Sequence, residues 1–187
     1  MEQNIPFPSE QFIEDFVFNK IITEKKCPIS GNEVALAFRQ VNLGAYGIID
    51  ILKVNFETLP SSEEFNISFS ILELKNQPLR PGDLAQLHRY KTGLNRYLSE
   101  IEGKFFNFNG LSFEVYTELA GTGFSDDLVY LITSVDTNFY ELSCSVDAGF
   151  KSKCRNSGYY NPQENKLVIY SVISEITSYF RGMHVSN

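Results

Sequence analysis

The sequence lacks the features that mark membrane-spanning, secreted and disulfide-rich proteins. No apolar run approaches the length of about 18 residues that a membrane-spanning helix needs. The first residues, Met1–Asn4, have neither the basic nor the apolar region of a signal peptide, so we expect a cytoplasmic protein without a membrane partner. The three cysteines, Cys27, Cys144 and Cys154, have no Cys-x-x-Cys spacing, which indicates neither a disulfide framework nor a zinc knuckle.

Positive charge is also scarce. The chain has 16 Lys and Arg residues against 23 Asp and Glu residues, and a formal net charge of −7. Phosphate contacts dominate the affinity of proteins for nucleic acid, so this balance disfavours a broad nucleic-acid-binding surface but allows a small positive patch around a site. Because 43% of the 187 residues are hydrophobic and 14% are aromatic, we expect residues 1–187 to fold as one domain with a substantial core.

The clearest pattern that is present is a β-hairpin. Residues 48–57 and 65–75 are rich in β-branched and aromatic residues, and Leu59–Glu64 between them contains the turn formers proline and serine. If the hairpin folds about the middle of that turn, Asp50 lies opposite Glu73. The pairs before it on the same face are all apolar: Phe56 with Ile67, Val54 with Phe69, and Leu52 with Ile71. The two carboxylates therefore end an apolar stripe.

Lys75 is expected to share a face with Asp50 and Glu73, because Glu73 and Lys75 are two residues apart on one strand. Two opposed carboxylates destabilise a strand pair, so one of them must take a proton or the pair must bind a cation. Carboxylate oxygens suit Mg²⁺ or Mn²⁺, which keep several water ligands when one or two carboxylates bind them. The alternative is that Lys75 only forms an ion pair with Glu73 at a solvated strand end.

Two helices are predicted, one before and one after the hairpin. The first spans Glu10–Ile22, with Ser9 as its N-cap and apolar residues at helical spacing. The second follows the loop Asn76–Gly82 and runs from a capping Asp83 to about Ile101. Its apolar stripe consists of Leu84, Leu87, Leu94 and Leu98, and another face carries Gln86, Tyr90, Gly93 and Tyr97.

The remaining segments predict further strands. Val34–Val41 precedes the hairpin, and three β-rich runs follow the second helix: Leu111–Leu119, Leu128–Val135 and Phe139–Val146. An amphipathic helix that ends at Gly182 is expected to close the chain. Together these elements predict an α/β domain with a central mixed β-sheet flanked by helices.

Basic residues recur near the C-terminal part of the chain. Lys151, Lys153 and Arg155 alternate at period two and precede Tyr159 and Tyr160, so one strand face is expected to carry positive charge beside aromatic rings. This stripe either contacts phosphate groups or protects a sheet edge from pairing, and both interpretations stay open. Further candidates for phosphate contacts are Arg39, which could equally be a solvated strand residue, and Arg80, His88 and Arg89.

Three segments together resemble the PD-(D/E)XK nuclease superfamily and its RecB-like branch. They are Gly47-Ile48-Ile49-Asp50, with Ile49 in place of the family's proline; Ile71-Leu72-Glu73-Leu74-Lys75; and Gln86-Leu87-His88-Arg89-Tyr90, which is similar to the Gln-x-x-x-Tyr helix of that branch. Arg39-Gln40 and Gly44 ahead of Asp50 add to the likeness. The resemblance covers Ser9–Leu98. It implies a restriction-endonuclease-like core in residues 9–101, with residues 105–182 as a β-rich extension and closing helix.

The resemblance implies a Mg²⁺- or Mn²⁺-dependent endonuclease that hydrolyses the phosphodiester bonds of nucleic acid, with DNA as the expected polymer. Asp50 and Glu73 would hold the ion. A glutamate of the first helix would join them, with Glu14 preferred and Glu10 as its rival. Both glutamates could also be ordinary acids that the helix dipole favours near a helix start.

The same resemblance assigns roles to the remaining residues of the motifs. Lys75 would orient the attacking water or stabilise charge on the phosphate, while Gln86 and Tyr90 would orient the lysine or the nucleic-acid backbone. Two other functions stay open: a nucleic-acid-binding or assembly module without useful turnover, and a metal-dependent hydrolase of other phosphates. The sequence also leaves open a homodimer or a partner protein that supplies positive surface.

Overall fold

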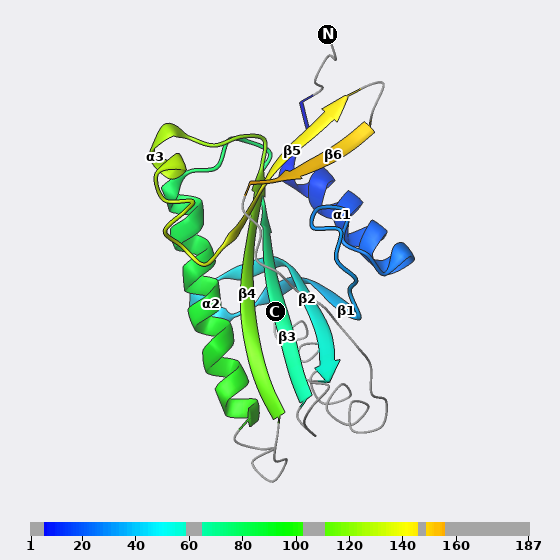
Figure 1. Ribbon diagram of the computed structural model, residues 1–187, viewed down its shortest axis with the longest axis vertical. Coiled ribbons are helices and arrows are strands. Elements are labelled where there is room, and N and C mark those ends of the chain that lie inside the picture. The colour runs from blue at the N-terminus through cyan, green and yellow to red at the C-terminus, as the bar shows by residue number, and fades with distance from the viewer. Residues whose placement is uncertain (1–5, 59–64, 103–110, 146–148, 156–187) are drawn as a thin grey trace.

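The computed structural model describes residues 6–58, 65–102, 111–145 and 149–155. Its strands are β1 (Leu36–Asn42), β2 (Ile48–Thr58), β3 (Phe65–Leu74), β4 (Leu111–Gly121), β5 (Asn138–Ser145) and β6 (Gly149–Cys154), and its helices are α1 (Glu10–Glu24), the 3₁₀ turn η1 (Gly44–Tyr46), α2 (Pro81–Glu102) and the short α3 (Asp126–Val129). The strands form one six-stranded sheet in chain order, with α1 against one face and α2 against the other (Figure 1). The predicted α/β class with a central mixed sheet is confirmed.

Strand direction changes within the sheet. β2 runs antiparallel to both β1 and β3. β3, β4 and β5 run parallel to one another, and β6 returns antiparallel to β5. A parallel pair of strands requires a crossover connection, and α2 supplies it between β3 and β4. This crossover is what brings the start of α2 next to the end of β3.

The β2–β3 hairpin pairs in the predicted register. Val54 lies opposite Phe69 and Leu52 opposite Ile71, and the ladder continues to Ile51 opposite Leu72. Asp50 and Glu73 are the next residues on their strands, so they fall on the face that carries Leu52 and Ile71. The predicted placement of the two carboxylates at the end of an apolar face is confirmed. The turn at 59–64 lies outside the described residues.

Each face of the sheet has its own hydrophobic core. The α2 face packs Leu52, Val54, Phe69 and Ile71 against Leu87, Leu94 and Leu98, and the α1 face packs Ile51, Leu72 and Leu74 against Ile13, Val17 and Ile21. All of these side chains are buried. Because each buried apolar side chain contributes roughly 1.5–3 kcal/mol, the two helices are held firmly on either side of the hairpin.

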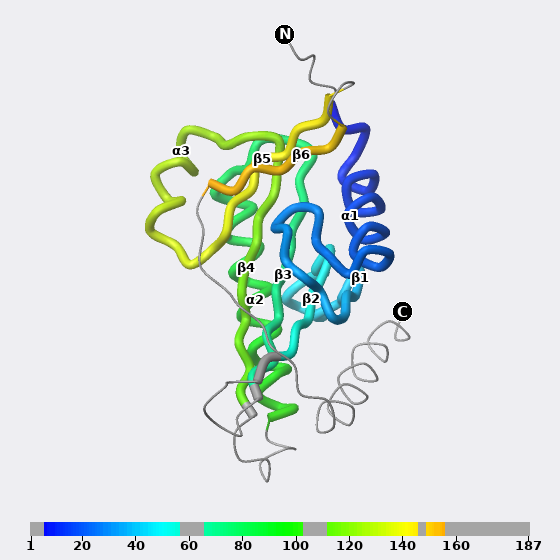
Figure 2. Tube along the Cα trace, turned by 45° about the vertical axis from the view of Figure 1, so that its right-hand side comes forward, coloured from blue at the N-terminus to red at the C-terminus, as the bar shows by residue number. Residues whose placement is uncertain are grey.

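The start of α1 is fixed by a cap and by the β5–β6 hairpin. Ser9 Oγ accepts a hydrogen bond of 3.1 Å from the Phe12 amide, which confirms Ser9 as the N-cap. The Phe150 ring of β6 packs edge-on against Phe7 and at a tilt against Phe16, with ring centroids 5.9 and 4.9 Å apart. Figure 2 shows the β5–β6 hairpin passing the first turn of α1. The first two turns of α1, which carry its candidate carboxylates, are therefore anchored to the sheet.

The prediction of a strand at Leu128–Val135 is wrong. Residues 126–129 form α3, and turns follow up to residue 134. Leu128 is fully buried, whereas Val129 and Tyr130 are 52% and 82% exposed, so burial does not alternate along this run as it would in a strand. Asp126 and Asp127 after Ser125 favour a helix start, and this local preference outweighs the β propensity of the apolar residues.

Several predicted boundaries also differ by one or two residues, among them the starts of α2 and β1. α2 starts at Pro81, a favoured first helical residue, and the carboxylate of Asp83 accepts a hydrogen bond of 2.8 Å from the Arg80 amide instead of occupying the N-cap. β1 begins at Leu36, two residues later than expected. The expected closing helix, Tyr159 and Tyr160 lie outside the described residues. Within those residues, no helix has the length and apolar character needed to span a membrane.

Candidate active site

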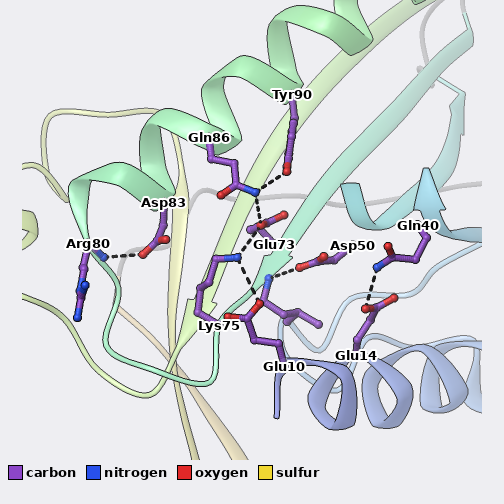
Figure 3. A network of polar contacts seen from close by, with 11 residues as sticks. Glu10, Glu14, Gln40, Asp50, Glu73, Lys75, Arg80, Asp83, Gln86 and Tyr90 are labelled. Carbon is purple, nitrogen blue, oxygen red and sulfur yellow. Dashed lines mark hydrogen bonds and ion pairs between the residues drawn. The ribbon is translucent and has the colours of Figure 1, made fainter. Parts of the chain in front are cut away.

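A polar network lies where β2 begins and β3 ends, between the starts of α1 and α2 (Figure 3). Glu73 is its centre and is only 1% exposed. Glu73 Oε1 accepts hydrogen bonds from Lys75 Nζ at 2.9 Å and from Gln86 Nε2 at 3.0 Å. Glu73 Oε2 is buried and has no hydrogen-bond partner among the described residues. Asp50 Oδ2 accepts a hydrogen bond of 2.9 Å from the Leu74 amide, which orients this second carboxylate at the same strand end.

Lys75 is held in place by both backbone and side-chain contacts. Its amide donates to the Ala120 carbonyl at 2.8 Å, so the residue continues the line of β3 beside β4. Its ammonium lies 2.9 Å from Glu73 and 3.6 Å from Glu10 of α1. The side chain is buried, so the sequence alternative of a solvated strand-end ion pair is not what the structure contains.

Gln86 and Tyr90 complete the network from α2. The Gln86 side-chain amide donates to both Glu73 and the Tyr90 hydroxyl. Its contact with Tyr90 agrees with the predicted shared helix face of the two residues. Tyr90 is 3% exposed because its ring lies against Gly47 at the start of the hairpin. A Cβ on Gly47 would lie 2.5 Å from Tyr90 Cε1, and Gly47 has a φ of +110°. Both facts require glycine at this position.

Burial governs the protonation of the two carboxylates. It raises the pKa of Glu73 to about 8, with the negative charge of Asp50 as the next cause and the ammonium of Lys75 opposing both. Burial also raises the pKa of Asp50 to about 6, against the hydrogen bond from Leu74 and the charge of Lys75. Burial lowers the pKa of Lys75, but the attraction of Glu73, Glu10 and Asp50 outweighs it and the net shift is upward. Near neutral pH the carboxylate pair therefore tends to keep a proton while Lys75 stays charged.

The two candidate glutamates of α1 have different partners. Glu14 is 5% exposed, and both of its oxygens are occupied: Oε1 lies 2.5 Å from Arg39 Nε and Oε2 lies 2.8 Å from Gln40 Nε2. Arg39 also reaches Asp15 at 2.5 Å. Glu10 contacts Lys75 and no other side chain of the network. Over the residues that the structure describes, no group of three or more His, Cys, Asp or Glu side chains is arranged to hold a metal.

Arg39 and Gln40 are residues whose position sequence reasoning missed. Arg39 is neither a solvated strand residue nor placed for phosphate, because it binds two carboxylates of α1. Gln40 has a φ of +51°, rare for a residue other than glycine. The ladder pairs Arg39 with Ile51 and Val41 with Ile49, so Gln40 lies opposite Asp50. Local sequence carries no signal for either contact, since both partners are about 25 residues away.

Asp50 and Glu73 fit the chemistry of a hard divalent cation. Their oxygens are the donors that Mg²⁺ and Mn²⁺ prefer, and the buried Glu73 Oε2 lacks the partner that a buried carboxylate oxygen needs. Two carboxylates are enough for an ion that keeps most of its water ligands. Each Glu14 oxygen already accepts one hydrogen bond, so an ion bound to Glu14 would share these oxygens with Arg39 and Gln40 and would face the positive charge of Arg39.

In the predicted basic stripe, Lys151 and Lys153 lie on β6, the last strand of the sheet among the described residues, and Arg155 directly follows β6. Lys151 and Lys153 are exposed, and Arg155 is paired with Glu141. The pairings Glu73–Leu119 and Leu119–Phe139, and the hydrogen bond from the Arg155 amide to the Phe139 carbonyl, place Arg155 three strands from Glu73. At the usual strand spacing this separation is about 14 Å. The stripe is therefore not adjacent to the carboxylates.

The comparisons with known proteins add no further information: no family model, curated protein or solved structure matches the chain.

Proposed function

We propose that this protein is a metal-dependent nuclease of the PD-(D/E)XK type, with a restriction-endonuclease-like core and with DNA as its expected substrate. The observation that supports this proposal is the incomplete hydrogen bonding of the buried Glu73 carboxylate. Its buried carboxylate is bound by Lys75 and Gln86 through one oxygen only, and it lies at the same strand end as the carboxylate of Asp50. A buried carboxylate oxygen without a partner is costly unless a ligand completes it.

Asp50 and Glu73 would hold the Mg²⁺ or Mn²⁺ ion. When bound, such an ion supplies a Lewis acid for the phosphoryl oxygen and a water of lowered pKa. The raised pKa of Lys75 means that this residue remains an ammonium ion and does not act as a general base. Lys75 would therefore donate hydrogen bonds to the attacking water or to the charge that develops on the phosphate.

Gln86 and Tyr90 would act as positioning residues. Gln86 donates a hydrogen bond to Glu73 Oε1, the same oxygen that accepts a hydrogen bond from Lys75. Gln86 also donates a hydrogen bond to the Tyr90 hydroxyl. This arrangement holds Lys75 in one geometry before substrate binds. Preorganised donors of this kind stabilise charge without a reorganisation cost during the reaction.

A cleavage assay tests the proposal. Plasmid, single-stranded DNA and RNA are incubated with the protein in Mg²⁺, Mn²⁺ or EDTA. We expect metal-dependent cleavage of at least one polymer, and a loss of at least about 100-fold in Asp50→Asn and Lys75→Ala, because each removes a group that stabilises the transition state. Asp127→Asn, which removes an exposed carboxylate of α3, is the matched control and should cleave normally. Cleavage that survives in Asp50→Asn would contradict the proposed site.

One observation favours a second function, a nucleic-acid-binding module of the same fold without useful turnover. Arg39 and Gln40 each bind one oxygen of Glu14, and the charge of Arg39 already balances this carboxylate, so the third carboxylate that the resemblance implies would be a weaker ligand for an ion in this arrangement. The two functions differ in one result. A binding module retains nucleic acid on a filter in Mg²⁺ or Mn²⁺ but yields no cleaved product, even with excess protein.

A further inference from the structure

The acidic character of this protein raises the question of where a polyanion could bind. Many of the described cations lie within ion-pair distance of a carboxylate, among them Lys20, Arg39, Lys53, Lys75, Lys91, Arg96 and Arg155. The α1 side of the site carries the carboxylates Glu10, Glu14 and Asp15. A nucleic-acid strand that entered over α1 would therefore meet negative charge first.

The α2 side of the site offers two arginines instead. Arg89 is exposed, directly precedes Tyr90, and has no carboxylate within ion-pair distance among the described residues. Arg96 is two helical turns further on, about 10.5 Å along the axis, and on the same side of the helix. Its side chain is 66% exposed, and Glu100 is only a marginal partner at 4.0 Å. We call this pair the α2 arginine face.

Both arginines are braced by the η1 turn. Arg89 Nε donates to the Tyr46 carbonyl at 3.0 Å, and Arg96 Nη1 donates to the Tyr46 hydroxyl at 3.4 Å. The Tyr46 ring packs on α2 at Gly93, where a Cβ would lie 2.5 Å from the ring. Each guanidinium uses one of its donors on Tyr46, which leaves most of its five donors for phosphate oxygens. A braced guanidinium also loses less side-chain entropy when it binds.

The η1 turn links this face directly to the carboxylates. Gly47 follows η1, lies under the Tyr90 ring, and leads into β2, where Asp50 is located. Other cations are less well placed. The Arg80 side chain points away from Glu73 and Lys75 in Figure 3, and Arg155, which directly follows β6, is paired with Glu141 of β5.

We propose that Arg89 and Arg96, braced on Tyr46, contact phosphate groups of the nucleic-acid strand that enters the site, so that the strand arrives over α2 and η1 and not over α1 or β6. This inference rests on the proposed function for the identity of the ligand. Phosphate is the chemistry that planar guanidinium groups recognise best. The two contacts account for how an acidic protein can hold an acidic polymer through a small positive surface.

Binding titrations test the inference separately from cleavage. The anisotropy of labelled single-stranded and duplex DNA is measured in EDTA over a series of salt concentrations. Each lost phosphate contact lowers the slope of log affinity against log salt by about 0.7 for a single strand and 0.9 for a duplex. We therefore expect the double change Arg89→Ala and Arg96→Ala to lower the slope by about 1.4–1.8. Circular dichroism and thermal melting check that the variant stays folded.

Three further variants identify the surface. Arg89→Lys with Arg96→Lys keeps both charges and should retain the wild-type slope. Lys20→Ala with Lys26→Ala removes two charges from the last turns of α1 and the segment that follows it, and Lys151→Ala with Lys153→Ala removes two from β6; neither should lower the slope. If the Lys151 and Lys153 variant lowers it instead, the entry path lies over β6 and the inference is overturned.

The outcomes separate this inference from the proposed nuclease activity. A slope that falls in the arginine variant, in a protein that cleaves nothing, supports the inference and refutes the nuclease. Metal-dependent cleavage with an unchanged slope supports the nuclease and overturns the inference. Wild-type protein that binds neither form of DNA in low salt also overturns it.

Discussion

At the scale of single residues, the main feature is a buried carboxylate pair that cannot be fully ionised on its own. Asp50 and Glu73 both have a raised pKa, first because of burial and then because of nearby negative charge, including that of Asp50 on Glu73. Lys75 compensates only part of this charge. The pair therefore requires either a proton or a cation, and these two occupants compete.

This competition predicts how stability depends on pH. The folded state holds more protons than the unfolded state between about pH 4, where free carboxyls titrate, and about pH 8, the raised pKa of Glu73. The free energy of unfolding should therefore fall as pH rises through this window, by on the order of 2–5 kcal/mol in the absence of metal. Urea unfolding in EDTA at pH 5, 6.5 and 8 measures it.

Two comparisons connect this pH effect to the pair. Asp50→Asn removes one charge and should make the pH dependence weaker and the protein more stable at pH 8 in EDTA, because Asn can still accept the Leu74 amide. Added Mg²⁺ should stabilise the wild type at pH 8 and have little effect on Asp50→Asn. The exposed change Asp127→Asn serves as control. A wild-type stability that is flat from pH 5 to 8 would contradict the raised pKa values.

At the scale of elements, the site depends on how η1 docks on α2. Tyr46 lies on Gly93 of the helix, and Tyr90 of the helix lies on Gly47 after the turn. Each aromatic ring thus fills the space that a glycine leaves on the opposite element. This double contact positions the start of β2, which carries Asp50, against the helix that carries Gln86 and Tyr90.

Substitution at Gly47 tests this docking. Gly47→Ala places a methyl group 2.5 Å from the Tyr90 ring at a φ of +110°. Gly31→Ala is a matched control, because Gly31 also has a positive φ, +75°, but its Cβ would meet nothing within 4 Å. Backbone strain alone costs about 1–2 kcal/mol. We expect Gly31→Ala to lose that amount. Gly47→Ala should lose at least about 2 kcal/mol more, because the methyl group overpacks against Tyr90 and because a φ of +110° with a ψ of −160° is a conformation that essentially only glycine adopts. Equal losses of unfolding free energy in the two variants, measured by thermal or urea unfolding, would show that the Tyr90 ring can move away from residue 47 at little cost.

At the scale of the whole molecule, a buried ion pair connects strands that are not neighbours. Lys53 Nζ lies 2.7 Å from both carboxylate oxygens of Glu118, and both side chains are almost fully buried. Lys53 belongs to β2 and Glu118 to β4, so the contact spans β3. Burial lowers the pKa of Lys53, but the charge of Glu118 outweighs it and the net shift is upward.

Removing one partner of this pair should be much worse than removing both. Lys53→Met leaves Glu118 buried without a counter-charge and should cost about 3–5 kcal/mol of unfolding free energy. Lys53→Met combined with Glu118→Leu replaces both charges by apolar groups and should recover most of that loss. The double-mutant cycle is measured by urea unfolding. If the double variant is as unstable as Lys53→Met alone, the loss does not come from the uncompensated charge of Glu118, and this explanation of the pair is wrong.

The sequence by itself determined which residues lie on the buried face of each strand and helix. The register of the β2–β3 hairpin, the α1 cap at Ser9 and the α2 stripe followed from it, because a strand or helix with one buried face allows a single arrangement of its apolar residues. The grouping of Asp50, Glu73 and Lys75 could be predicted for the same reason. Helical spacing also placed Gln86 and Tyr90 on one face of α2, but their position beside the carboxylates was expected only from the resemblance to nuclease motifs.

Only the tertiary structure decided which groups meet across elements. Arg39 and Gln40 donate hydrogen bonds to Glu14 because β1 lies beside α1. Lys53 contacts Glu118 because the crossover after β3 brings β4 next to β3. Leu128–Val135 forms the end of α3 and the turns that follow it because, of this run, only Leu128 is fully buried in the core. Such contacts depend on distances between segments far apart in the chain, and no local period in the sequence encodes those distances.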